Sequence, residues 1–371
     1  MTPSLPSLAY TDPAQFSLEK TRLFAREWVA ACRSEEIPAP GDFRVIDLVG
    51  ESVLVRRGGD GALHAHHNVC RHRGARLCRG DAPLKPGRAD IPDAVSAAGH
   101  VRCPYHGWVY DAAGALVAAP HVGDDPAFDR APFSLYPVGL AELAGFVFLH
   151  LSPQGAPPLA TQIAEVGPRI ANYTMADLRI GHRIGYEVEA NWKIICENYN
   201  ECYHCGPVHP ELCALVPAFR NAGGQDLDWT RGIPHRDGAV TFTWSGSTTR
   251  ALLPGLDEDE RSRHKGELIY PNLFLSLACD HVAAFVLHPR GPASTRVECL
   301  FLFAADEMAR PGFDHTDATS FWDTVNQQDW TICERVQQGM NSSAHAQGYY
   351  APMEDANLDM GRYLRETMAR S

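Results

Sequence analysis

Two short motifs, each pairing one cysteine with one histidine, constrain this chain more than any other feature. Cys70 and His72 lie in CRHRG, and Cys103 and His106 lie in CPYHGW. Two thiolates and two imidazoles, one of each per loop, match the ligands of a Rieske [2Fe–2S] cluster, in which cysteines hold one iron and histidines the other. A tetrahedral zinc site with the same ligands is the alternative. The glycine and arginine residues beside both motifs favour two tight loops that clasp one redox cluster.

Further along the chain, the stretch ENYNECYHCGPVH holds a second group of potential metal ligands. Glu201 and His204 are three residues apart, so a helix would carry both on one face. Gly206 and Pro207 predict the end of that helix and a turn that brings His209 back beside His204. Two imidazoles and a carboxylate from elsewhere would form the facial triad of a non-haem Fe(II) site. For this stretch alone, a helix end with surface histidines or a zinc site remains open.

Three acids compete to be the third iron ligand: Asp323, Asp329 and Glu334, all in a helix predicted over about residues 317–340. Asp329 is the single carboxylate on the apolar face of this helix, whereas the other two acids fall on a more polar face. A buried and unpaired charge is too costly to persist, so Asp329 should be coordinated or paired. The apolar face is made of Trp322, Val325, Asp329, Cys333, Val336 and Met340. The prediction is that His204, His209 and Asp329 hold Fe(II).

Taken together, the segments NVCRHRGARL, CPYHGW, NWKIICENYNECYHCGPVH and QDWTICERVQQG resemble the catalytic (alpha) subunit of Rieske non-haem iron oxygenases, the ring-hydroxylating oxygenase family. The resemblance covers most of the chain. Within the family, ECYHCGPVHPEL and the acid Glu201 resemble the branch that acts on quaternary ammonium compounds such as carnitine and betaines. The family's carboxylate ligand lies five residues before a glutamate, as Asp329 lies before Glu334.

The pattern of strands and helices predicts an α+β protein. Strand-like runs such as GHRIGYEVE, AVTFTW, GELIYPNLFLSL, HVAAFVLHP and TRVECLFLF suggest one large antiparallel sheet. Helices over 191–205 and 317–340 would cover it and leave a cavity between. The resemblance implies a helix-grip catalytic domain of this kind and a separate antiparallel-β Rieske domain.

The expected domain boundaries follow from composition. Residues 39–152 should form the Rieske domain, which ends at the linker-like PQGAPP. Residues 153–371 should form the catalytic domain, against which the N-terminal segment 1–38 packs. The spacing between His72 and Cys103 is longer than the resemblance implies, and the excess is assigned to a proline- and glycine-rich surface loop over 80–99.

Bulk properties exclude several functional classes. The net charge of −12 argues against a nucleic-acid partner. Neither a transmembrane run nor a secretory signal is apparent, and eleven scattered cysteines fit a reducing cytoplasm. The expected location is therefore cytoplasmic.

The two predicted metal centres imply a reaction that consumes O2. The [2Fe–2S] cluster would relay electrons to the mononuclear iron, and its histidine ligands raise its potential. Because no GxGxxG motif in a strand–turn–helix context is present, NAD(P)H must be oxidised by a separate flavin or iron–sulfur reductase. A Rieske electron carrier without catalysis and an inactive oxygenase-like binding protein are the other classes considered.

The predicted substrate is a small N-methylated or quaternary ammonium compound, hydroxylated beside nitrogen so that it loses a methyl group or breaks its C–N bond. Aromatic faces can cage such a cation, at roughly 0.5–2 kcal/mol per contact. The candidate aromatics are Trp229, Phe242, Trp244, Tyr270, Phe274 and Phe285, although each could equally be ordinary sheet core. Dioxygenation of an aromatic acid is the alternative.

The resemblance also implies a ring-shaped homotrimer in which the cluster of one subunit abuts the iron of its neighbour. Glu201 is then predicted to bridge the two centres by accepting the ring N–H of His204 and that of the neighbour's His106. The alternative role for Glu201 is to orient His204 within its own chain.

Overall fold

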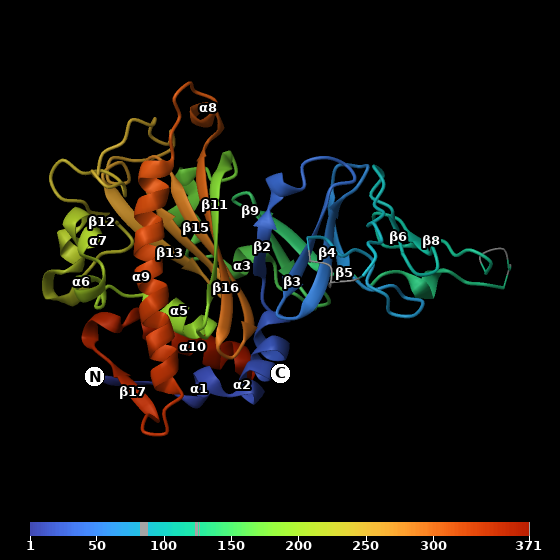
Figure 1. The fold of residues 1–371 in the computed structure, drawn as a ribbon, viewed down its shortest axis with the longest axis horizontal. Coiled ribbons are helices and arrows are strands. Elements are labelled where there is room, and N and C mark those ends of the chain that lie inside the picture. Colours follow the sequence, from blue (N-terminus) through green and yellow to red (C-terminus); the bar gives the residue numbers. More distant parts are fainter. Residues whose placement is uncertain (82–87, 123–124, 126, 371) are drawn as a thin grey trace. The chain divides into compact units, whose positions relative to one another are not determined.

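The computed structural model describes residues 1–81, 88–122, 125 and 127–370, and within them the chain forms two compact units. One unit comprises residues 30–157, and the other combines residues 1–29 with 158–371. Residues 30–38 therefore group with the smaller unit, while the first 29 residues group with the large C-terminal part (Figure 1).

The described residues of the smaller unit form three sheets of three strands each. The strand orders are β2-β10-β9, β3-β4-β5 and β6-β7-β8. The bounds are β2 Val29–Arg33, β3 Phe43–Leu48, β4 Glu51–Arg57, β5 Leu63–His67, β6 Val101–Arg102, β7 Val109–Tyr110, β8 Leu116–Ala118, β9 Gly139–Leu143 and β10 Phe146–His150. The first cysteine–histidine loop follows β5, and the second lies between β6 and β7, so the sheets hold the bases of both loops.

The larger unit is organised around a six-stranded antiparallel sheet in the order β11-β16-β15-β14-β13-β12. Its strands are β11 Leu178–Val188, β12 Ile233–Pro234, β13 Arg263–Ile269, β14 Leu273–Leu277, β15 Val282–Gly291 and β16 Ser294–Ala304. A two-stranded sheet pairs β1 Thr2–Pro6 with β17 Gln347–Tyr350. The large antiparallel sheet with its long helix confirms the α+β prediction.

Helices cover one face of this sheet, and Figure 1 shows the longest, α9, lying across it. The helices of this unit are α1 Leu8–Thr11, α2 Pro13–Glu19, α3 Leu159–Gln162, α4 Gly167–Ile170, α5 Trp192–Tyr199, α6 Cys205–Val208, α7 Pro210–Leu215, α8 Ala305–Met308, α9 Thr316–Met340 and α10 Ala356–Ala369. Trp322, Val325, Trp330 and Cys333 bury one side of α9. Val336 is 38% exposed, so the predicted apolar face was wrong at that position.

Two strand predictions need correction. The run at residues 239–244, AVTFTW, forms no strand, although Phe242 within it is fully buried. The hydroxyl groups of this segment are satisfied locally instead: Thr241 donates to Asp280 Oδ1 at 2.6 Å, and Thr243 donates to the carbonyl of Ser247 at 2.7 Å. The run GELIYPNLFLSL is divided between β13 and β14 by a turn at residues 270–272.

Candidate functional site

Three side chains from separate segments converge in the larger unit. His204 precedes α6, His209 lies between α6 and α7, and Asp329 lies in the middle of α9. The Oδ1 atom of Asp329 is 3.3 Å from Nε2 of His204 and 2.9 Å from Nε2 of His209. The potential ligand atoms of the three residues all lie within 4.8 Å of one another. Two imidazole nitrogens and one carboxylate oxygen at this spacing fit the donor set of a non-haem Fe(II) triad, which leaves further coordination positions open.

The electrostatics of this site favour a cation. Burial raises the pKa of Asp329, but hydrogen bonds with His204 and His209 outweigh it and bring the pKa down to about 2. Burial lowers the pKa of His204, yet its hydrogen bonds with Asp329 and Glu201 leave that pKa well above the usual value. Asp329 therefore stays ionised, and its negative charge attracts a cation, either protons on the two histidines or a divalent ion that replaces them.

Asp323 and Glu334, the competing acids of α9, have other partners. Asp323 accepts a hydrogen bond from the hydroxyl of Tyr186 at 2.8 Å. Glu334 accepts one from the backbone N–H of Glu189 at 3.1 Å. Neither belongs to the group of potential ligands formed by the two histidines and Asp329 among the described residues.

Glu201 was expected on the same helix as His204, and this prediction was wrong. α5 ends at Tyr199, and Glu201 lies in the segment that follows. Its Oε2 accepts hydrogen bonds from the backbone N–H groups of Tyr203 and, at 3.2 Å, of His204. The carboxylate thus accepts hydrogen bonds from backbone N–H groups of the turn that leads into α6. Its Oε1 also lies 2.6 Å from Nδ1 of His204, so Glu201 contacts the predicted ligand even without a shared helix.

Gly206 and Pro207 were expected to end a helix, but they lie inside the short helix α6. Pro207 is tolerated there because the first-turn N–H groups of a helix have no intrahelical partner. His209 returns beside His204 as predicted, with the two ring centroids 5.1 Å apart.

In the smaller unit, the two cysteine–histidine loops share one construction. The N–H of Gly74 donates to the carbonyl of Cys70 at 3.0 Å, and the N–H of Gly107 donates to that of Cys103 at 3.1 Å. Both glycines have φ near +72°, a conformation that other residues rarely adopt. The four-residue spacing from cysteine to glycine therefore closes each loop tightly around its histidine.

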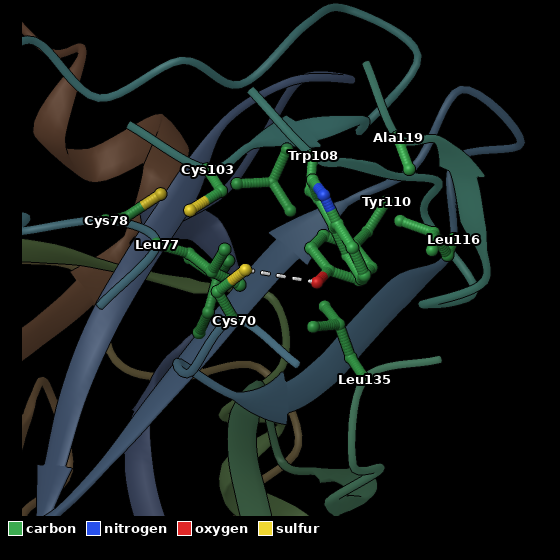
Figure 2. Close-up of a cluster of buried hydrophobic side chains, with 11 residues drawn as sticks. Cys70, Leu77, Cys78, Cys103, Trp108, Tyr110, Leu116, Ala119 and Leu135 are labelled. Carbon is green, nitrogen blue, oxygen red and sulfur yellow. Dashed lines mark hydrogen bonds between the residues drawn. The ribbon is translucent and has the colours of Figure 1, made fainter. Parts of the chain in front are cut away.

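These loops bring the four predicted cluster ligands together. The rings of His72 and His106 have centroids 4.7 Å apart, and His72 stacks on Trp108 at 4.8 Å. Cys70 and Cys103 are buried in one core cluster (Figure 2). Two buried thiols and two paired imidazoles fit the mixed ligand set of a Rieske [2Fe–2S] centre.

The surroundings of the loops contain groups that the sequence reading missed. The Tyr110 hydroxyl lies 3.2 Å from Sγ of Cys70, the contact marked by a dashed line in Figure 2.

Of the predicted 80–99 loop, residues 82–87 lie outside the described residues. Asp93, in the described part, accepts hydrogen bonds from the backbone N–H groups of Arg79 and Gly80 at 2.7 and 2.8 Å.

A cavity of about 620 Å³ in the larger unit is lined by His204, His209 and Asp329. Of the six predicted aromatic residues, Trp229 and Tyr270 line it. The other four do not: Phe242, Phe274 and Phe285 are buried in the core, and Trp244 is 51% exposed. Phe274 stacks against Tyr199 with ring centroids 4.6 Å apart, which places Tyr199 rather than Phe274 at the cavity.

Four of the rings that line the cavity form an aromatic box, defined here as Tyr199, Phe219, Trp229 and His264. Phe219 and Trp229 stack at 5.8 Å, and His264 lies edge-on to both, at 6.2 and 6.3 Å. Burial lowers the pKa of His264 to about 3, so its ring is neutral at ordinary pH.

Small residues on the sheet keep this space open. Gly266 pairs with Ser276 across β13 and β14, and both line the cavity. A Cβ atom at Gly266 would lie 3.4 Å from Trp229, 3.6 Å from the Tyr199 hydroxyl and 3.7 Å from Nε2 of His264. The sequence signal for the cavity wall was therefore a glycine and a serine within strands, not the aromatic residues of those strands.

Comparison with known proteins identifies both units. Residues 175–370 match the family model for the ring hydroxylating alpha subunit (catalytic domain), and residues 27–133 match the Rieske [2Fe-2S] domain. The glycine betaine monooxygenase oxygenase subunit of Chromohalobacter salexigens is 30% identical over 98% of this chain and 86% of its own length. The carnitine monooxygenase oxygenase subunit of Acinetobacter pittii is 34% identical over 61% of this chain and 58% of its own length.

Solved structures share the fold. A quaternary ammonium Rieske monooxygenase in complex with the substrate gamma-butyrobetaine superposes with a TM-score of 0.74 at 24% identity, covering 99% of this chain and 95% of that chain. Naphthalene 1,2-dioxygenase from Rhodococcus sp. bound to indole gives a TM-score of 0.74 at 20% identity, with the same coverage of 99% and 95%. No helix among the residues that the structure describes has the length and apolar character needed to cross a membrane.

Proposed function

Because this chain belongs to the family of Rieske non-haem iron oxygenases, as a ring-hydroxylating alpha subunit, we propose that it hydroxylates a small N-methylated or quaternary ammonium compound. The chain would be the oxygenase component of a multicomponent monooxygenase. Hydroxylation beside nitrogen would lead to N-demethylation or C–N cleavage of a betaine- or carnitine-like substrate. O2 would be the co-substrate.

One observation carries this proposal: the aromatic box and the three potential iron ligands line one cavity. Several π faces around one space suit a quaternary ammonium group, at roughly 0.5–2 kcal/mol per contact. The relatives that match most of the chain or its larger part include glycine betaine and carnitine monooxygenase oxygenase subunits. With iron bound by His204, His209 and Asp329, the site would supply the activation of O2.

Oxidation of an aromatic acid is the alternative, and naphthalene 1,2-dioxygenase shares the fold. The charges of the cavity argue against it. Arg169 binds both carboxylate oxygens of Glu267 at 2.7 Å, and Arg362 pairs with Asp359 at 2.7 Å. An aromatic acid would have to compete with these carboxylates for a guanidinium group, whereas a cation would not.

The test is a substrate screen with the purified oxygenase and a surrogate reductase. Betaines, carnitine-like cations, choline-like cations and aromatic acids are each supplied, and O2 consumption is compared with product formed. We expect tight coupling of O2 use to product for quaternary ammonium compounds. Coupling by aromatic acids, with none by any quaternary ammonium compound, would overturn the proposal.

Electrons are proposed to come from NAD(P)H through a separate flavin or iron–sulfur reductase, because the chain has no nucleotide-binding motif of its own. The Rieske centre on Cys70, His72, Cys103 and His106 would receive them. We further propose a homotrimer in which this centre serves the iron of a neighbouring subunit.

Glu201 has the hydrogen-bonding capacity for an inter-subunit bridge. A carboxylate offers about four acceptor positions. Three are used, by the N–H groups of Tyr203 and His204 and by Nδ1 of His204. The remaining position could accept the ring N–H of the neighbour's histidine.

Substitution Glu201→Gln tests the bridge. Reduction of the cluster by the reductase and most of the mononuclear iron should be retained, while reoxidation of the cluster by substrate and O2 slows by orders of magnitude. Stopped-flow absorbance of the Rieske centre measures both steps. Reoxidation at the wild-type rate in an intact oligomer would contradict the bridging role.

A further inference from the structure

Gln328 connects His209 to a carboxylate that lies outside the group of potential ligands. Its Oε1 is 2.7 Å from Nδ1 of His209, and its Nε2 donates a hydrogen bond to Oε2 of Glu211 at 3.1 Å. Gln328 is the residue immediately before Asp329 in α9, and Glu211 lies in the first turn of α7. Both side chains are half-buried, and His209 is 1% exposed.

The chemistry of these groups determines where the proton of His209 lies. An ionised carboxylate only accepts hydrogen bonds, so Glu211 must face the NH2 group of the Gln328 amide. The amide then presents its oxygen, which also only accepts, to His209. Nδ1 of His209 must therefore donate its N–H to Gln328, which leaves Nε2 as the ring nitrogen that can bind a metal ion. Nε2 is the nitrogen that faces Asp329, at 2.9 Å.

His204 reaches the same state by a shorter route. Its Nδ1 lies 2.6 Å from Oε1 of Glu201, so a carboxylate accepts the ring proton directly and Nε2 again faces Asp329. Both imidazoles therefore donate through Nδ1, His204 to an anion and His209 to a neutral amide. A histidine ligand whose other ring nitrogen donates to such a partner is fixed in both tautomer and ring orientation.

We propose that Gln328 and Glu211 are positioning residues that hold His209 in the tautomer able to bind iron through Nε2. This inference rests on the proposed iron site of His204, His209 and Asp329. Both residues lie outside the group of potential ligands and outside the lining of the cavity. Glu211 fixes the orientation of the Gln328 amide, and this amide fixes the orientation of the His209 imidazole. Gln328 and Glu211 therefore act as one unit.

The experiment measures Fe(II) affinity rather than turnover. The mononuclear iron is removed from the purified full-length protein with a chelator that leaves the Rieske cluster in place, and Fe(II) is titrated back without oxygen against a competing chelator. The Rieske absorbance spectrum and the thermal unfolding of the iron-depleted protein report on structural integrity.

Gln328→Leu should raise the Kd for Fe(II) by about 10–100-fold, with an unchanged Rieske spectrum and unfolding temperature. Gln327→Leu is the matched control, because the same change is made one position earlier at an exposed side chain. Its affinity should equal that of the wild type. In the double variant Gln328→Glu/Glu211→Gln, the carboxylate at 328 accepts from His209 and the amide at 211 donates to that carboxylate, while the net charge is unchanged. Its Fe(II) affinity should be close to that of the wild type.

Wild-type affinity in Gln328→Leu would refute the positioning role. If Gln328→Leu lowers both the Fe(II) affinity and the unfolding temperature, and the double variant does not restore the affinity, Gln328 has a structural role instead. If the wild-type protein binds no mononuclear iron in addition to its Rieske cluster, the proposed function itself is refuted. This outcome is distinct from failure of the inference about Gln328 and Glu211.

Discussion

Glu197 lies in α5, where the hydroxyl groups of Tyr10 and Tyr350 both donate hydrogen bonds to its Oε1, at 2.6 and 2.8 Å. Burial raises the pKa of this carboxyl group to about 7, although the two tyrosines and the charge of Lys193 act to lower it. The negative charge of Glu354 acts in the same direction as burial. We expect Glu197→Gln to remove a pH dependence of stability, because glutamine keeps an acceptor oxygen for both hydroxyls but cannot ionise.

The sign follows from the raised pKa. In the unfolded chain this carboxyl group titrates near its ordinary value of 4.5, and in the folded protein near 7. Its favourable contribution is complete below pH 4.5 and is lost as pH rises through 7, since the folded state resists ionisation. Between about pH 5.5 and 8 the linkage amounts to at most about 2 kcal/mol, and solvent contact of Glu197 reduces this figure.

Denaturant unfolding of wild type and Glu197→Gln, followed by tryptophan fluorescence at several pH values, measures the effect. The stability difference between variant and wild type should shift in favour of the variant by about 1–2 kcal/mol from about pH 5.5 to 8. Glu366→Gln, at an exposed position of α10, is the control and should show no such shift. A constant difference for Glu197→Gln across this range would refute the argument.

Three further outcomes are expected. Asp329→Ala should lose the mononuclear iron while Asp323→Ala keeps it, as measured by iron analysis with the Rieske spectrum as reference; the reverse pattern would show that the ligand was misassigned. Gly266→Val should weaken binding of a quaternary ammonium substrate about tenfold or more by filling the aromatic box, with little change in unfolding temperature, and unchanged binding by calorimetry would remove the box from the substrate site. His264→Phe should bind the same cation with wild-type affinity and with the same pH dependence between about pH 5 and 8. If acidification weakens binding to the wild type but not to the variant, His264 becomes charged in that range.

The features predictable from the sequence are those that depend on local spacing. Cysteine–histidine loops closed by glycine have a conformation set within a few residues, so Cys70, His72, Cys103 and His106 could be recognised directly. Asp329 could be chosen over Asp323 because helical periodicity separates a buried face from a polar one. The end of α5 at Tyr199 could not be chosen in this way, because residues 200–203, which follow it, include no glycine or proline to mark a helix end.

The cavity wall was harder to predict because it depends on register and on what packs over each strand. Phe274 and Ser276 lie on the same face of β14, two residues apart. Tyr199 covers the former, whereas the latter remains at the cavity. Phe219 ends the 3-10 helix Pro217–Phe219, which is too short to give a periodic signal. The role of Gln328 likewise arises only when α7 and α9 come together in the fold.

The burial of His264 completes the physical argument for a cation site. An imidazolium in the aromatic box would repel a quaternary ammonium group at about 6 Å by roughly 3 kcal/mol at an effective dielectric constant of about 20. This repulsion exceeds the roughly 0.5–2 kcal/mol by which one aromatic face stabilises a bound cation. Because burial lowers the pKa of His264 to about 3, the ring stays neutral and presents a polarisable face instead of a charge. A neutral His264 can then surround the cation together with Tyr199, Phe219 and Trp229. A histidine in this position is therefore compatible with a cationic substrate.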